Sequence, residues 1–146
     1  MTILFCNPPG LLYNPRMDKF GRIIIPCGFI PEKHELETAN FFAELGREVV
    51  FLMPSRAKGV RTPDILVDGQ RWEIKSPCGN SKRTIENNFR RALKQSENII
   101  FDLRRIKLDE QLAISKIKRE LSSQHSGKIR RIIIITKKYK ILDFKR

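Results

Sequence analysis

Runs of apolar residues divide most of the chain into short strands and amphipathic helices. Short continuous runs predict buried strands at residues 48–53, 98–103 and 128–137, with a final strand at 139–144. Apolar residues spaced three or four apart predict helices at 32–46, 82–95 and 109–122, with Leu45 in the apolar stripe of the first and Leu112 in that of the third. Together with a hairpin at 63–75, these elements follow the order αβββαβ and then αββ. We therefore predict one α/β (α+β) domain with a mixed central sheet and helices packed on it.

The first 33 residues have a different pattern, because proline and glycine recur throughout them. No helix is expected there, although residues 3–5 and 22–25 are apolar enough for short strands. We predict an irregular N-terminal arm over residues 1–33 and the main domain over residues 34–146.

The hairpin centres on Asp68-Gly69, a two-residue turn signal. Counting outward from this turn places Asp64 opposite Glu73, and Lys75 lies on the same face as Glu73 because side chains alternate along a strand. The other face is apolar and is expected to meet the core. It carries Ile65, Val67, Trp72 and Ile74.

Two carboxylates placed opposite each other on a sheet repel, so stability does not favour this pairing. A hard cation between the two carboxylates replaces their repulsion with attraction to the ion, because Mg²⁺ binds carboxylates together with phosphate and water. Lys75 adds a positive charge where a phosphate or a developing anion would lie. The pattern favours a metal-dependent phosphodiesterase centre. The competing interpretation is an exposed hairpin with a salt-bridged charge cluster.

The charge balance limits the kinds of binding partner that we expect. A net charge of +13 favours a polyanion, either nucleic acid or an anionic membrane surface. No apolar run is long enough to span a membrane, and the N-terminus lacks the basic and apolar regions of a signal peptide. The three cysteines, widely spaced, predict reduced thiols rather than a disulfide framework or a zinc site.

The second predicted helix carries a cluster of positive charge of almost one sign. We interpret it as a surface for phosphate backbones, against the alternative of an ordinary solvated face. The basic residues are Lys82, Arg83, Arg90, Arg91 and Lys94. In the first predicted helix, Glu35 and Glu37 lie in or near the first turn, where acids also stabilise the helix dipole.

The element order, with Pro63-Asp64 and then Glu73-x-Lys75, resembles the PD-(D/E)XK nuclease superfamily over residues 34–103. The resemblance implies that Asp64, Glu73 and a first-helix acid hold Mg²⁺ or Mn²⁺. Glu35 is in the implied position, and Glu37 is the alternative. It also implies that a glutamine of the second helix lies near the site, for which Gln95 is the candidate.

A narrower resemblance, over residues 34–144, is to the C-terminal nuclease domains of CdiA-type contact-dependent growth-inhibition toxins. The matching segments are Gly46–Val49, Pro63–Ile65, Trp72–Pro77, Thr84-Ile85, Ala92–Ser96 and Ile99–Arg104. This likeness implies a toxin that cleaves tRNA in the cytoplasm and a cognate immunity protein. The chain opens with Met1 and has no evident delivery region, so we expect an excised domain, a free-standing relative or an element of a mobile genome.

Three alternatives stay open from the sequence. One is a metal-independent ribonuclease of the barnase, colicin or RelE type, using Lys75, His34, Thr84 and Arg104. Another is a DNA endonuclease, because DNA and RNA are both bound through phosphates. The third is a basic module without catalysis, such as an immunity or adaptor protein, and it leaves the facing carboxylates unexplained.

Overall fold

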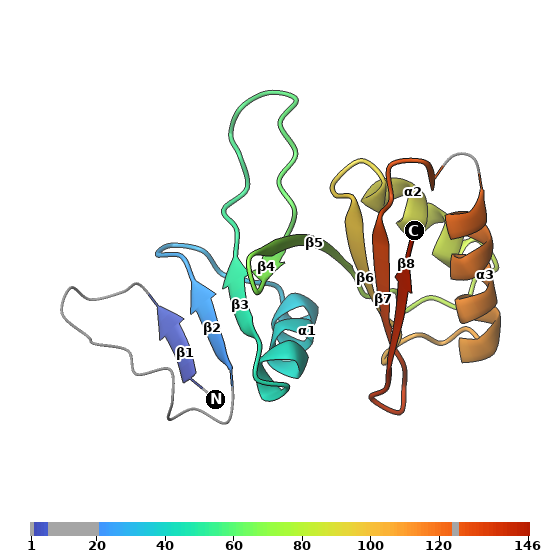
Figure 1. The fold of residues 1–146 in the computed structure, drawn as a ribbon, viewed down its shortest axis with the longest axis horizontal. Helices are drawn as coiled ribbons and strands as arrows, with labels where there is room; N and C mark the ends of the chain where they lie inside the picture. Colours follow the sequence, from blue (N-terminus) through green and yellow to red (C-terminus); the bar gives the residue numbers. More distant parts are fainter. Residues whose placement is uncertain (1, 6–20, 124–125) are drawn as a thin grey trace. The chain divides into compact units, whose positions relative to one another are not determined.

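The computed structural model describes residues 2–5, 21–123 and 126–146, and the chain divides into two compact units, residues 1–71 and 72–146 (Figure 1). Eleven elements are described: β1 (Thr2–Phe5), β2 (Arg22–Ile25), α1 (Lys33–Glu44), β3 (Glu48–Phe51), β4 (Ile65–Val67), β5 (Gln70–Lys75), α2 (Thr84–Ala92), β6 (Asn98–Asp102), α3 (Glu110–Ser122), β7 (Arg131–Ile135) and β8 (Ile141–Lys145). From α1 onward the order is the predicted αβββαβ followed by αββ, and the α+β class is confirmed.

The first unit is a mixed sheet with one helix. Strands β1, β2 and β3 are parallel, and β4 runs antiparallel to β3. Helix α1 lies against β2 and β3 (Figure 1). Its apolar stripe is buried at Ala39, Phe42 and Ala43, as are Ile23 and Val49 of the strands.

A close backbone approach at Gly21 holds this unit together where β2 begins. The Gly21 amide donates to the Ala43 carbonyl at 2.6 Å. A Cβ atom at Gly21 would lie 1.9 Å from the Arg47 carbonyl oxygen, so only glycine fits. The two expected strands near the N-terminus are present as β1 and β2, and the division into an arm and a main domain stays a prediction.

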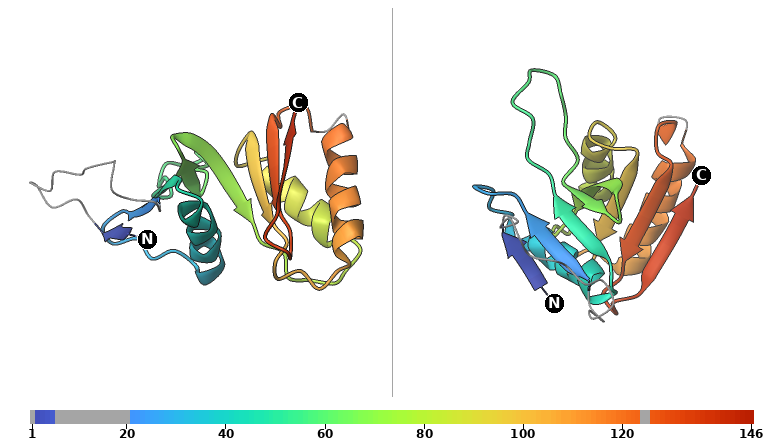
Figure 2. Two further views of the ribbon diagram at one scale, coloured as in Figure 1. Left: turned by 60° about the horizontal axis from the view of Figure 1, so that its bottom comes forward. Right: turned by 60° about the vertical axis from the view of Figure 1, so that its left-hand side comes forward.

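The second unit contains three parallel strands, β5, β6 and β7, with β8 antiparallel to β7. Helices α2 and α3 cover one face of this sheet (Figure 2). The core between them includes Ile85, Phe89, Phe101, Ile117 and Ile132. The four isoleucines at 132–135 are all buried, as expected for an interior strand, and β8 is paired on one side with β7.

Several sequence predictions are wrong in detail. Leu45 and Leu112 were expected in apolar stripes but are 53% and 41% exposed. Leu45 is the C-cap of α1, beyond the buried face. In α3, Asp109 caps the helix, and the buried stripe consists of Ala113, Ile114 and Ile117, so Leu112 points aside.

The prediction of reduced cysteines is also wrong in part. Cys27 is disulfide-bonded, whereas Cys78 is a free, exposed thiol. Cys6 lies outside the described residues.

Candidate functional site

The turn that organises the predicted site forms as expected. Asp68 and Gly69 both adopt positive φ, at 48° and 81°, which is the backbone of a type I′ hairpin turn. The Asp68 carboxylate also accepts from the Glu48 amide at 3.0 Å and from Arg47 at 2.8 Å. Asp64 and Glu73 belong to different units, so their pairing across the hairpin stays a prediction.

In the first unit, Glu35 and Asp64 line one pocket of about 260 Å³. Glu35 comes from the first turn of α1, and Asp64 directly precedes β4. The other lining residues are Phe29, Ile30, Glu32, Leu52, Pro54, Thr62 and Pro63. The structure therefore brings together two of the predicted acids, which lie 29 residues apart in the sequence.

The environment of Glu35 favours the protonated acid. Burial raises the pKa of Glu35, and the negative charge of Asp64 raises it further, while a hydrogen bond from the Glu32 amide at 3.1 Å acts in the opposite direction. Glu37, the alternative acid, is exposed on the same helix and lies 3.9 Å from Lys33. Of the two, Glu35 has the surroundings of a functional carboxylate.

In the second unit, Glu73 and Lys75 lie on one face of β5, as predicted from the alternation. The Lys75 Nζ is 2.5 Å from the Glu73 Oε1. Glu73 is only 2% exposed, and 18% of the Lys75 side chain is exposed. Their partners in the register are Ile99 and Phe101 of the helix-covered core, so this ion pair lies on the inner face of the sheet.

This ion pair joins no two elements, because both residues belong to the same strand. Burial of a charge carries a desolvation cost that the attraction of its partner offsets only in part. A buried pair within one strand is therefore a poor stabilising device, and its position favours a chemical role.

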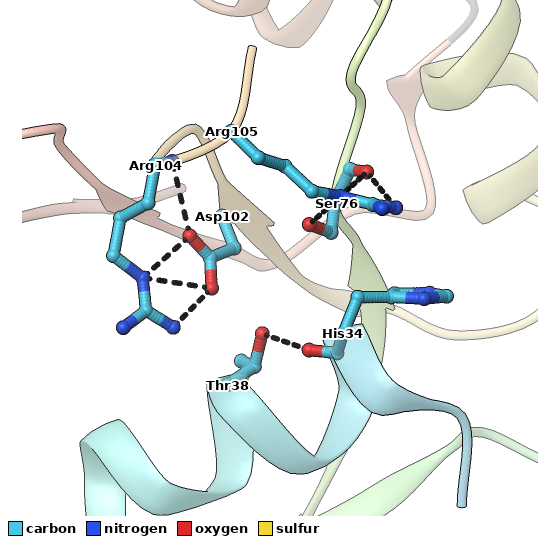
Figure 3. Close-up of polar contacts among 6 residues, drawn as sticks. All are labelled: His34, Thr38, Ser76, Asp102, Arg104 and Arg105. Carbon is cyan, nitrogen blue, oxygen red and sulfur yellow. Dashed lines mark hydrogen bonds and ion pairs between the residues drawn. The ribbon is translucent and has the colours of Figure 1, made fainter.

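Sequence analysis did not single out Asp102 and Arg105, which lie at the carboxyl ends of the parallel strands. Asp102 is 3% exposed, and Arg104 surrounds its carboxylate, with the shortest contact 2.6 Å from Nη2 (Figure 3). Arg105 donates to the Ser76 carbonyl at 2.6 Å and to its hydroxyl at 2.8 Å (Figure 3). The available signal was an acid at the end of a buried strand, with two arginines two and three residues later. Ligands of parallel sheets bind at this end of the strands.

The predicted phosphate-binding residues all lie on the second unit. Lys82, Arg83, Arg90, Arg91 and Lys94 are exposed, as this role requires. Gln95 is half-buried and lies beyond the last residue of α2, Ala92, so it is not on the helix where it was expected.

His34, named in the metal-independent alternative, lies 3.3 Å from a carboxylate oxygen of Glu32. Its carbonyl accepts from the Thr38 hydroxyl at 3.1 Å (Figure 3). Across residues 2–5, 21–123 and 126–146, no group of three His, Cys, Asp or Glu side chains is arranged to hold a metal ion. In the same ranges, no helix has the length and apolar character needed to cross a membrane.

Comparison with known proteins places the chain in a family. Residues 61–141 match the family described as the contact-dependent growth inhibition CdiA C-terminal domain, a span that includes Asp64, Glu73 and Lys75. The comparison with curated protein sequences gives no significant match.

A solved structure has a similar fold. It is the CdiA-CT/CdiI toxin and immunity complex from Burkholderia pseudomallei, with a TM-score of 0.60 and 20% sequence identity. The match covers 81% of this chain and 94% of that one. Since the family model matches more than half of the sequence, the chain belongs to the CdiA C-terminal domain family, the toxin domains of contact-dependent growth inhibition.

Proposed function

We propose that this domain is a metal-dependent endonuclease of the PD-(D/E)XK type that cleaves RNA as a growth-inhibition toxin. The observation that carries the proposal is the acidic pocket of the first unit. Glu35 and Asp64 line it together, and burial and mutual repulsion raise the pKa of Glu35. Two neighbouring carboxylates repel each other and so do not favour stability, whereas neighbouring carboxylates are the ligands that a hard cation binds.

The oxygen donors in this pocket fit a hard divalent cation such as Mg²⁺ or Mn²⁺. Asp64 and Glu35 are the residues of this pocket that would hold the ion, and the PD-(D/E)XK resemblance adds Glu73 as a third ligand. When bound, such an ion supplies Lewis-acid activation of the phosphoryl oxygen and a water molecule that is easier to deprotonate.

Lys75 has a separate task in this proposal. Its ammonium, held 2.5 Å from Glu73 and mostly buried, is preorganised to stabilise the negative charge that develops on the attacked phosphate or to orient the attacking water. The low solvent exposure of this pair strengthens its electrostatic effect, because little water is present to screen it.

Substrate binding follows from charge. The net charge of +13 and the exposed Lys82, Arg83, Arg90, Arg91 and Lys94 suit a phosphate backbone. We favour RNA, and tRNA in particular, over DNA, because the sequence resembles tRNA-cleaving CdiA-type toxins. Such a substrate places the toxin's action in the cytoplasm of the target cell.

A cognate immunity protein belongs to the same proposal, since the similar solved structure is described as a toxin and immunity complex. An inhibitor of so basic a domain is expected to present an acidic surface, because complementary charge speeds association and excludes wrong partners.

The test is a substrate panel of total RNA, purified tRNA and plasmid DNA, each incubated with the protein in Mg²⁺ and in EDTA. We expect cleavage of tRNA in Mg²⁺ and none in EDTA. Full cleavage in EDTA with 2′,3′-cyclic phosphate ends would instead assign a metal-independent ribonuclease. Cleavage of plasmid alone would assign a DNA endonuclease.

A further inference from the structure

The hairpin between β7 and β8 has an unusually well-fixed turn. The Tyr139 amide donates to the Thr136 carbonyl at 2.9 Å, and the Thr136 amide donates to the Lys140 carbonyl at 2.9 Å. The Thr136 hydroxyl accepts from the Lys140 amide at 3.1 Å, and the Lys137 amide donates to Glu110 of α3 at 2.6 Å. The turn is therefore held by its own backbone and by the neighbouring helix.

Tyr139 occupies the one position in this turn where glycine is normally preferred. Its φ is 59°, in the left-handed region, and a turn followed by a left-handed residue is the usual three-residue hairpin with a bulge. A bulky side chain is a genuine outlier at positive φ. The Tyr139 side chain is not recruited to the core either, because it is 67% exposed. Neither the backbone nor the core explains a tyrosine at this position.

The ring of Tyr139 is held in place from one side. The Arg104 guanidinium carbon lies 5.4 Å from the ring centroid, within the range of a cation–π contact. Arg104 is itself fixed by four hydrogen bonds to the buried Asp102 carboxylate. Asp102 and Arg104 thus serve as a rigid backing for an exposed aromatic ring.

Positively charged residues flank Tyr139 along the turn. Lys137, Lys138 and Lys140 are its neighbours in the turn and are all exposed. An exposed ring among lysines is the combination that proteins use to bind single-stranded nucleic acid, with bases stacking on the ring and phosphates meeting the cations. The turn lies at the carboxyl end of β7, the end of the sheet that also carries Asp102 and Lys75 on the parallel strands (Figure 1).

We propose that Tyr139 is a stacking platform for an unpaired nucleobase of the substrate, with Lys137, Lys138 and Lys140 contacting the adjacent phosphates. This inference rests on the proposed nuclease function and adds a preference to it. The domain engages single-stranded segments, such as the loops and ends of an RNA, rather than regular duplex. Duplex bases are stacked on one another and present no free face to the ring.

The experiment measures equilibrium binding of a short 2′-O-methyl RNA single strand in EDTA, conditions under which neither a metal-dependent nor a 2′-OH-dependent nuclease cleaves it. A duplex of the same length is the comparison. We expect Tyr139→Gly to weaken single-strand binding about fivefold or more, and duplex binding by much less. Tyr139→Phe is the matched control, and it should bind the single strand within about twofold of the native protein, because stacking needs the ring and not the hydroxyl.

Thermal unfolding separates this role from a structural one. Tyr139→Gly should keep the native melting temperature, because glycine suits positive φ better than tyrosine does. Unchanged single-strand affinity in a folded Tyr139→Gly would overturn the platform, and an equal loss for strand and duplex would do the same. If either of these results were found and the native protein cleaved RNA, the proposed nuclease function would be kept and the proposed role of Tyr139 would be wrong. Selective loss of strand binding without any cleavage would leave the platform and remove the nuclease.

Discussion

Two carboxylate–lysine pairs in the second unit have nearly the same geometry and different settings. Glu86 of α2 lies 2.6 Å from Lys116 of α3 and 2.9 Å from Arg119, so this pair links two helices that share a core. Burial alone would raise the pKa of Glu86, but the hydrogen bond and charge of Lys116, together with Arg119, lower it. Glu73 lies 2.5 Å from Lys75, and both residues belong to the same strand, β5.

The difference separates a pair that stabilises the packing of two helices, Glu86–Lys116, from a pair for which we propose a chemical role, Glu73–Lys75. The Glu86 pair closes a contact between residues 30 positions apart, and removing it loosens the packing of α2 against α3. The Glu73–Lys75 pair carries the desolvation cost of burial, and its two members are only two residues apart on one strand. Buried charges of this second kind collect at functional sites, because catalysis needs groups whose environment opposes their ordinary state.

The largest expected effect is the loss of RNA cleavage when Glu73 is replaced. Glu73→Gln should lower RNA cleavage by at least about 100-fold, the range for removing a preorganised charged group. Because this change leaves the half-buried Lys75 ammonium without its carboxylate partner, it should also destabilise the fold. The double variant E73Q/K75M should recover the native melting temperature and stay inactive. Native-like cleavage by the folded double variant would remove the pair from the mechanism, and Glu86→Gln, which should cleave normally, is the control.

An intermediate effect is expected at Glu35, where function and stability should move in opposite directions. The pKa of Glu35 is raised in the folded protein, so its stabilising contribution is present below the ordinary value of 4.5 and is lost as pH rises through the raised pKa. Glu35→Gln removes the buried charge and keeps the amide contact at the start of α1. Cleavage should fall at least about tenfold, while the melting temperature at neutral pH stays equal or rises.

Glu37→Gln is the matched control for this experiment, because Glu37 lies on the same helix and is exposed. A loss of activity in Glu37→Gln with full activity in Glu35→Gln would reverse the assignment of the third acid. Melting curves of both variants and of the native protein between pH 4 and pH 8 test the predicted dependence on pH.

The smallest effect concerns the helix–helix pair. Glu86→Gln should lower the free energy of unfolding by about 1 kcal/mol, since the group is partly buried, and lower the melting temperature by about 3 °C. Because its pKa is lowered, this contribution is present above the ordinary value of 4.5 and should disappear as pH falls through the folded pKa. Glu97→Gln, in an exposed pair with Arg130, should change stability far less. An equal effect in the two variants would contradict the structural role of Glu86.

Much of the fold could be predicted because its signals are local. Apolar periodicity located α1, α2 and α3 and the buried strands, and the Asp68-Gly69 pair identified a turn whose backbone has the expected positive φ. The alternation of side chains along a strand correctly placed Glu73 and Lys75 on one face of β5. Errors arose at helix ends, as with Leu45 and Leu112, where one position decides whether a side chain meets the core.

The element order, the candidate acids and the basic surface were predictable from the chain alone, because each depends on residue types at short spacing. Packing in three dimensions established which of those residues share an environment. It brought Glu35 and Asp64 to one pocket, placed the buried Glu73 and the half-buried Lys75 on the helix-covered face of β5, and set Arg104 against Tyr139. Burial and long-range contact arise from packing between distant segments, and no local pattern encodes them.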